Sequence, residues 1–132
     1  KPAVFLAGGI GITPFRSIIK HAAETELPHQ IILFYSNRTP GDTAFLQDLV
    51  GWAKSNPYFK FIATMTQLPN NASWSEEKGY VDEPMLKKYL PNITKPIFYI
   101  AGPPAFVKAM NELLVRIGVF EDNIRTEEFA GY

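Results

Sequence analysis

Mostly apolar segments occupy positions 3–7, 30–36, 59–66 and 96–101 of the chain. Apolar runs of this length are typical of strands in a parallel sheet that is covered on both faces. A fifth, more polar strand is expected at 123–129. Between these segments apolar residues recur at every third or fourth position, which predicts amphipathic helices. Four helices are expected, at residues 14–24, 46–53, 82–90 and 106–117.

Strands that alternate with helices predict a doubly wound α/β fold, in which a five-stranded parallel sheet has helices on both faces. With the first and fourth strands as neighbours and right-handed crossovers, the strand order is 3-2-1-4-5. Ligands bind such sheets beyond the carboxyl ends of the strands, where the strand order reverses. The turns after the first and fourth strands are therefore expected to face the same crevice.

The turn after the first strand reads Gly8-Gly9-Ile10-Gly11-Ile12-Thr13-Pro14. Gly9 and Gly11 let the backbone turn tightly and leave no Cβ in the way of a ligand, so Gly9→Val is expected to abolish nucleotide binding in a folded chain. Thr13 is expected as the helix N-cap, with Pro14 at the first helical position. The N–H groups there suit a pyrophosphate, the alternative being a tight turn without a ligand.

A dinucleotide fingerprint of the G-x-G-x-x-G type would have a third glycine where this chain has Pro14, and an acidic residue at the end of the second strand. That strand instead ends in Ser36-Asn37-Arg38, which argues against a simple dehydrogenase. We interpret Ser36 and Arg38 as groups that could meet the adenosine ribose or a phosphate on it. The alternative for Arg38 is a solvated loop arginine.

Composition narrows the range of functions. The chain has 132 residues, the length of one domain, and 13 basic against 13 acidic residues, so its net charge argues against a nucleic-acid binder. It contains no cysteine for disulfides or thiolate chemistry. No apolar run approaches the ~20 residues needed to span a bilayer, and we expect no signal peptide at the start of this sequence. His21 and His29 are expected at the surface rather than in a metal site.

Two further features concern the organisation of the chain. It has no initiator Met, and its first residues lead directly into a buried strand, so we expect 1–132 to be one domain from a longer protein. Residues 67–79 form a polar loop longer than most connections in a compact domain. Trp74 is expected to pack this loop down.

Four segments together resemble the nicotinamide-binding domain of the ferredoxin–NADP reductase superfamily. They occur in the family's order over the whole chain and read Gly8-Gly9-Ile10-Gly11-Ile12-Thr13-Pro14, Tyr35-Ser36-Asn37-Arg38, Ala101-Gly102-Pro103-Pro104 and Glu127-Glu128-Phe129. The resemblance implies an oxidoreductase in which a nicotinamide cofactor passes hydride to a flavin. The protein would align the two cofactors, which supply the chemistry.

The resemblance also implies roles for single residues. The first segment would hold the pyrophosphate, and Gly102-Pro103-Pro104 would lie against the nicotinamide end. Phe129 would pack beside the isoalloxazine. Glu127 would be a proton-transferring or positioning group, or else an exposed carboxylate at a strand end.

The chain departs from the family in two ways. Many members have a cysteine where this chain has Ala101, so the thiol is missing while room for the nicotinamide is kept. Members also carry an upstream flavin-binding barrel with an Arg-x-Tyr/Phe-Ser/Thr signature, which this sequence does not contain. FAD is therefore expected on a separate upstream domain, and the isolated chain is expected to be inactive.

The choice between NADH and NADPH depends on the residues after the third strand. NADP-specific relatives often have a serine and an arginine there, whereas this chain has Thr66-Gln67. Thr66 offers a hydroxyl but Gln67 brings no charge, which favours NADH, although Arg38 could substitute.

The sequence leaves the electron acceptor open among ferredoxins, haem proteins, iron–sulfur domains and small oxidants. A cytoplasmic location is expected, or the cytosolic face of a membrane if the full-length chain is anchored. The alternative function is a non-catalytic nucleotide-sensing or protein-interaction domain on the same scaffold. A flavodoxin-like carrier fits less well, because the first turn has no hydroxyl before Thr13.

Overall fold

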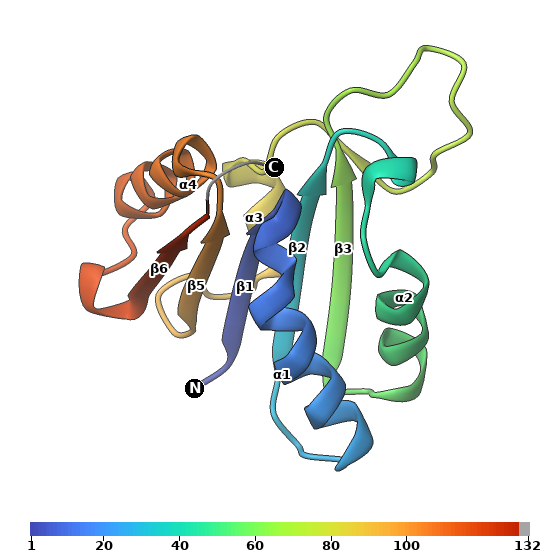
Figure 1. Cartoon of the computed structure of the whole chain (residues 1–132). Helices are drawn as coiled ribbons and strands as arrows, with labels where there is room; N and C mark the ends of the chain where they lie inside the picture. Colours follow the sequence, from blue (N-terminus) through green and yellow to red (C-terminus); the bar gives the residue numbers. More distant parts are fainter. Residues whose placement is uncertain (130–132) are drawn as a thin grey trace.

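The computed structural model describes residues 1–129 of the chain (Figure 1). Its centre is a parallel sheet of six strands in the order β4-β3-β2-β1-β5-β6. The strands are β1 (Ala3–Gly8), β2 (Ile31–Asn37), β3 (Phe59–Met65), β4 (Glu77–Lys78), β5 (Ile97–Gly102) and β6 (Ile124–Glu128). The doubly wound parallel fold is confirmed, and the five predicted strands lie in the predicted order.

The number of strands was predicted one too low. The additional strand, β4, consists of two residues that pair with Thr64 and Met65 at the end of β3. It lies within the segment that the sequence predicts as a polar loop. Two charged residues form no apolar run, so the pattern that predicts the other strands gives no signal here.

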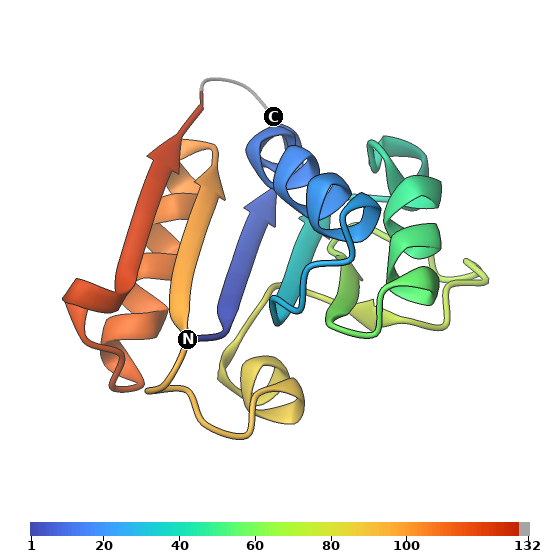
Figure 2. The ribbon, with the colours of Figure 1, turned by 90° about the horizontal axis from the view of Figure 1, so that it is seen from below.

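Within the described residues, four α-helices cover the sheet, two on each face (Figure 2). The helices α1 (Ile12–Glu24) and α2 (Leu46–Ser55) pack on one face, and α3 (Glu83–Tyr89) and α4 (Pro104–Arg116) pack on the other. None of these helices is long and apolar enough to cross a membrane. Trp74 is half-buried, as a packing role in its loop requires.

Side chains of the central strands alternate between two cores. Val4 and Leu6 of β1 lie in the core under α3 and α4 together with Phe34 of β2. Phe5 and Ala7 lie in the core under α1 and α2. Successive residues of a strand point to opposite faces, so a strand covered on both faces is apolar at every position. This explains the mostly apolar runs in the sequence.

The start of α1 differs from the prediction. The chain leaves β1 through a 3-10 turn at Gly9–Gly11, so α1 begins at Ile12 and Gly11 takes the N-cap position. Thr13 lies inside the first helical turn, and its prediction as the N-cap is wrong. Pro14 follows as the third helical residue, where its missing N–H would have had no partner within the helix.

Candidate functional site

The carboxyl ends of the parallel strands meet at one edge of the sheet, and predicted site residues gather there (Figure 1). Gly8 ends β1 beside Ser36 of β2. Ala7 of β1 pairs with Ala101 of β5, and Ser36 pairs with Thr64 of β3. The strand order reverses between β1 and β5, so the switch point lies at Gly8 and Ala101.

The turns after β1 and β5 are in direct backbone contact. A Cβ added to Gly11 would lie 2.0 Å from the carbonyl oxygen of Ala101 and 2.7 Å from the amide nitrogen of Gly102. A Cβ added to Gly102 would lie 3.1 Å from the carbonyl oxygen of Gly8. The sequence interpretation gives Gly11 the role of opening space for a ligand. In the structure its first role is to let the two turns pack together.

Gly9 serves the turn by its conformation. It is buried, and its φ of 53° lies in the left-handed region that side chains with a Cβ rarely adopt. A valine at this position would therefore strain the backbone, contrary to the expectation that Gly9→Val leaves the fold intact. Among the described residues, no side-chain hydrogen bond caps the start of α1, and the amide of Ile12 donates to the carbonyl oxygen of Gly9 within the 3-10 turn. The helix start is the kind of place where anions bind in doubly wound folds.

Phe106 of α4 lies against both turns. A Cβ on Gly8 would lie 2.7 Å from Cγ of the Phe106 ring, and a Cβ on Gly102 would lie 2.8 Å from its Cδ2. In the sequence, Phe106 stands out only as part of an apolar helical face. The structure adds that its ring fills the space beside two glycines of the predicted site.

A groove of about 530 Å³ opens beside these turns, on the face that α3 and α4 cover. Ser36, Thr66 and Pro103, all predicted as site residues, line it. Tyr80 and Asp82 also line it and were not predicted. Tyr80 is 75% exposed, which is unusual for a large aromatic side chain. A possible sequence signal is its place directly after the glycine that ends the long polar loop.

The loops that follow β2 and β3 are tied together by hydrogen bonds. The amide of Thr66 donates to the carbonyl oxygen of Asn37 at 2.9 Å, and its hydroxyl donates to the same oxygen at 3.3 Å. The amide of Gln67 donates to the carbonyl oxygen of Arg38 at 2.9 Å. Arg38 is exposed and does not line the groove. The structure thus brings Arg38 near Thr66 but not into the groove with it.

β6 brings the predicted C-terminal residues beside the end of β5. Glu127 pairs with Ala101, and the amide of Phe129 donates to the carbonyl oxygen of Gly102 at 2.8 Å. Phe129 is half-buried against the core under α1 and α2, whereas Glu127 is exposed. Both residues therefore lie next to the turn that the sequence assigns to the nicotinamide, and their roles stay predictions.

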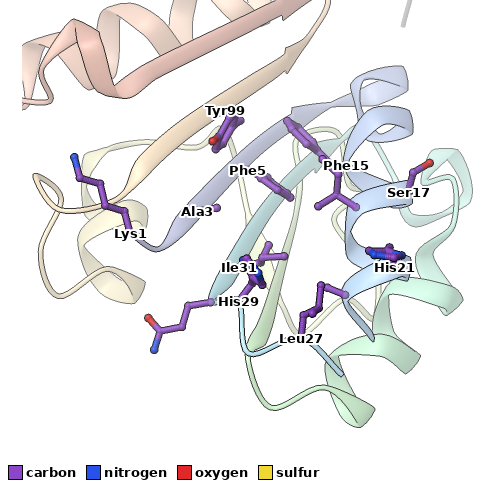
Figure 3. Close-up of a pocket in the computed structure, with 13 residues that line it drawn as sticks. Lys1, Ala3, Phe5, Phe15, Ser17, His21, Leu27, His29, Ile31 and Tyr99 are labelled. Carbon is purple, nitrogen blue, oxygen red and sulfur yellow. The ribbon is translucent and has the colours of Figure 1, made fainter. Parts of the chain in front are cut away.

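A second groove, of about 520 Å³, lies at the opposite edge of the sheet, near the amino ends of β1 and β2 (Figure 3). Phe5 forms its centre, with ring centroids 4.4 Å from Phe15 and 5.5 Å from Tyr99. His21 and His29 line it and are exposed. Residues 1–129 hold no group of three or more His, Cys, Asp or Glu arranged for a metal ion. The glycine turns lie at the other edge, so this groove is separate from the candidate site.

A parallel sheet with helices on both faces and two glycine turns at its switch point defines the class of doubly wound nucleotide-binding domains. Within this class, residues 5–112 match the model of the oxidoreductase NAD-binding domain, and the chain belongs to that family. The predicted relation to the NAD(P)H-binding domains of flavin-dependent reductases is thereby confirmed.

The similar proteins are longer than this chain. It is 30% identical to the reductase component of propane 2-monooxygenase from Rhodococcus jostii, over 98% of the chain and 35% of that protein. It is 31% identical to a flavohemoprotein from a Burkholderia species, over 98% of the chain and 33% of that protein. The cytochrome b5 reductase domain of Ulva prolifera nitrate reductase is similar with a TM-score of 0.85 and 26% identity, over 96% of the chain and 50% of that structure. The chain thus spans about a third of the length of these two curated relatives.

Proposed function

We propose that this chain binds NAD(P)H along the carboxyl edge of its sheet and holds the nicotinamide for hydride transfer to FAD on a separate, upstream domain of the same protein. The observation that carries the proposal is the backbone contact between the turns after β1 and β5, where Gly11 and Gly102 meet at the switch point. Membership of the NAD-binding family supports the choice of a dinucleotide as the ligand.

The pyrophosphate would lie over Gly9 and Gly11 at the start of α1. Glycine has no Cβ that would shield the backbone N–H groups there, and the helix start has no side-chain cap among the described residues. The positive end of the helix dipole adds to the attraction for an anion. Thr13 and Pro14 complete this segment in the first helical turn.

The adenosine half would enter the groove beside the turns. Ser36 and Thr66 offer hydroxyl groups there, and the exposed ring of Tyr80 offers a flat surface on which a purine can stack. Thr66 is followed by the uncharged Gln67, which supports NADH rather than NADPH. A contact between Arg38 and a 2′-phosphate is the alternative.

The nicotinamide would lie against Gly102, Pro103 and Pro104, with Phe129 beside it and Glu127 at the edge. Ala101 leaves room for the ring without supplying a thiol. These residues orient the nicotinamide, and the two cofactors supply the hydride chemistry. The final electron acceptor stays unnamed, and a cytoplasmic or membrane-face location is part of the proposal.

Calorimetric titration of the chain with NADH and NADPH tests this function. Saturable binding is expected, tighter for NADH, because hydroxyls without a cation favour a nucleotide without a 2′-phosphate. The purified chain should carry no flavin absorbance and should oxidise no NADH alone. Binding of neither nucleotide would point instead to an interaction module, and a tightly bound flavin would contradict the separate flavin domain.

A further inference from the structure

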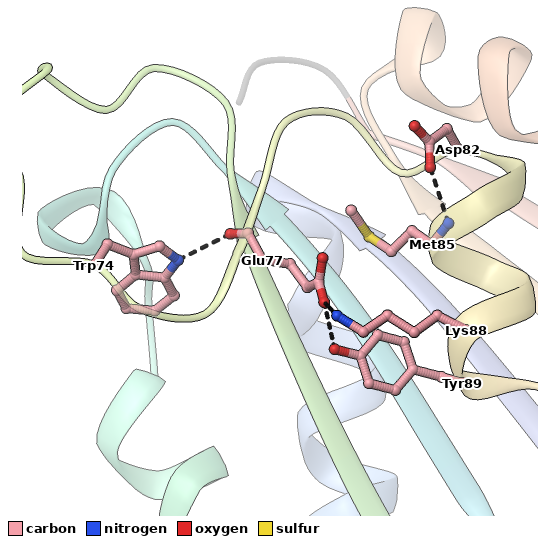
Figure 4. A network of polar contacts seen from close by, with 6 residues as sticks. All are labelled: Trp74, Glu77, Asp82, Met85, Lys88 and Tyr89. Carbon is pink, nitrogen blue, oxygen red and sulfur yellow. Dashed lines mark hydrogen bonds and ion pairs between the residues drawn. The ribbon is translucent and has the colours of Figure 1, made fainter.

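Glu77 joins the edge strand β4 to helix α3 (Figure 4). Its carboxylate oxygen Oε2 accepts hydrogen bonds from Nζ of Lys88 at 2.6 Å and from the hydroxyl of Tyr89 at 2.5 Å. Both donors belong to the last turn of α3. The Glu77 side chain is 19% exposed, so water screens these contacts less than it screens a surface ion pair.

Helix α3 is a firm support for this carboxylate. Asp82 caps the helix by accepting a hydrogen bond from the amide of Met85 at 3.0 Å. At the other end of α3, the ring of Tyr89 lies edge-on to Phe34 in the core, with centroids 5.9 Å apart. A group bound to Tyr89 and Lys88 is therefore fixed relative to the sheet.

The backbone around Glu77 is anchored as well. The indole N–H of Trp74 donates to the carbonyl oxygen of Glu77 at 2.9 Å (Figure 4). Two residues later, the amide of Gly79 donates to the carbonyl oxygen of Met65 at 2.8 Å. The carbonyl oxygen of Gly79 accepts a hydrogen bond from the Thr64 hydroxyl at 2.6 Å. Glu77 thus supplies the side-chain anchor of a segment whose backbone is bound to β3.

Tyr80 follows this anchored segment directly and lines the groove beside the glycine turns. Because its side chain is 75% exposed, little packing of its own fixes the ring, and its direction depends on the backbone that precedes it. Glu77 does not line the groove. Any effect of Glu77 on a ligand in the groove must therefore pass through the backbone of residues 78–80.

We propose that Glu77 is a positioning residue for the adenosine half of the nucleotide. By binding Lys88 and Tyr89, it holds the backbone of β4 so that Tyr80 presents its ring to the purine. This inference rests on the proposed function, which supplies the ligand. It assigns no direct contact between Glu77 and the nucleotide.

The test compares Glu77→Gln with Glu83→Gln in the chain as it exists. Glu83 is a matched control, because it forms an exposed ion pair with Lys87 at 2.6 Å on the same helix and does not line the groove. NMR titrations measure the Kd of NADH, of 5′-AMP as the adenosine half, and of nicotinamide mononucleotide as the other half. Thermal unfolding of each variant confirms that it is folded.

Glu77→Gln is expected to raise the Kd of NADH and of 5′-AMP about tenfold, which corresponds to about 1.4 kcal/mol. The Kd of nicotinamide mononucleotide should change less than about twofold, and Glu83→Gln should leave all three values unchanged within the same margin. If Glu77 only supported the fold, Glu77→Gln would raise the Kd of 5′-AMP and the Kd of nicotinamide mononucleotide together. Tyr89→Phe keeps the ring on Phe34 and removes one donor, so a smaller, equally selective loss is expected.

An unchanged Kd of 5′-AMP in folded Glu77→Gln would overturn the inference, as would a parallel rise for both halves. If Glu77→Gln does not fold, Tyr89→Phe decides by the same criterion. NADH binding that is insensitive to both variants would leave the proposed function standing and remove only the role of Glu77. If the unchanged chain binds no nucleotide at all, the function and the inference fail together.

Discussion

At the scale of single residues, the glycines Gly11 and Gly51 have completely different surroundings. A Cβ at Gly11 would lie 2.0 Å from the carbonyl oxygen of Ala101, whereas a Cβ at Gly51 would have nothing within 4 Å. Gly51 lies in the interior of α2. The first glycine is required by backbone packing at the switch point, and the second only adds flexibility to a helix.

Gly11→Ala is expected to destabilise the chain by about 2–4 kcal/mol, because the backbone of β5 must move to relieve the overlap. Gly51→Ala, its control, is expected to stabilise the chain by about 0.5–1 kcal/mol. Urea denaturation followed by circular dichroism measures both changes in the free energy of unfolding. Similar values for the two substitutions would contradict the packing role of Gly11.

At the scale of elements, the sequence predicts well those strands and helices whose signal is a local pattern. β1, β2, β3 and β5 carry apolar runs, and each end of these strands lies within one residue of its predicted position. β4 has no such pattern, because contacts with β3 and α3 hold it rather than its own composition. Thr13 fits the general preference for an N-cap, but the 3-10 turn before it starts the helix earlier.

The candidate site divides in the same way. Its glycine and proline turns are visible in the sequence because they interrupt strand and helix patterns. Tyr80 and Phe106 give no comparable signal, since their relation to the site comes from the packing of α3 and α4 around the groove. The positions of these two residues in the site depend on contacts between elements that are distant in the sequence, and a local sequence pattern does not reveal such contacts.

The contacts of Glu77 stabilise the edge strand β4 only over a limited range of pH. The hydrogen bond from Lys88, followed by that from Tyr89, lowers the pKa of Glu77 below its ordinary value of 4.5. The hydrogen bond to Glu77 raises the pKa of Tyr89 above 10.0. Lys60 is a further charged group facing this cluster, with Nζ 5.6 Å from the Tyr89 ring. The ionised Glu77 carboxylate therefore stabilises the fold at pH values above the carboxyl pKa of the unfolded chain, and this stabilisation is lost as the pH falls. The protonated Tyr89 hydroxyl stabilises the fold at pH values below the tyrosine pKa of the unfolded chain, and this stabilisation is lost as the pH rises.

Glu77→Gln is therefore expected to destabilise the chain by about 1–2 kcal/mol near neutral pH. The difference from the unchanged chain should shrink as the pH falls below the ordinary carboxyl value of 4.5, because Glu77 itself then becomes protonated. Urea denaturation of both proteins at several pH values measures it. Glu83→Gln serves as the control, with a difference expected at about 0.5 kcal/mol or less. A Glu77 effect that is the same at every pH would show that the charge is not what stabilises β4.

At the scale of the whole molecule, the two edges of the sheet differ in chemistry. The carboxyl edge holds the glycine turns and a groove with hydroxyl groups, while the groove at the amino edge is centred on aromatic rings. Segments from the beginning, middle and end of the chain form the carboxyl edge, from Gly8 to Phe129. The nucleotide site proposed at this edge therefore needs a completed sheet.

Because β1 lies in the middle of the sheet and pairs with both β2 and β5, the ribosome makes this central strand before either neighbour and completes β5 much later. Ala3 cannot meet Ile97 until residues 4–96 between them have been synthesised. A nascent chain ending at residue 96 is thus expected to lack a cooperative fold, since one side of β1 has no partner strand. Cooperative urea unfolding of a purified 1–96 chain would contradict this, whereas its absence would mark residues 97–129 as the segment whose release from the ribosome permits folding.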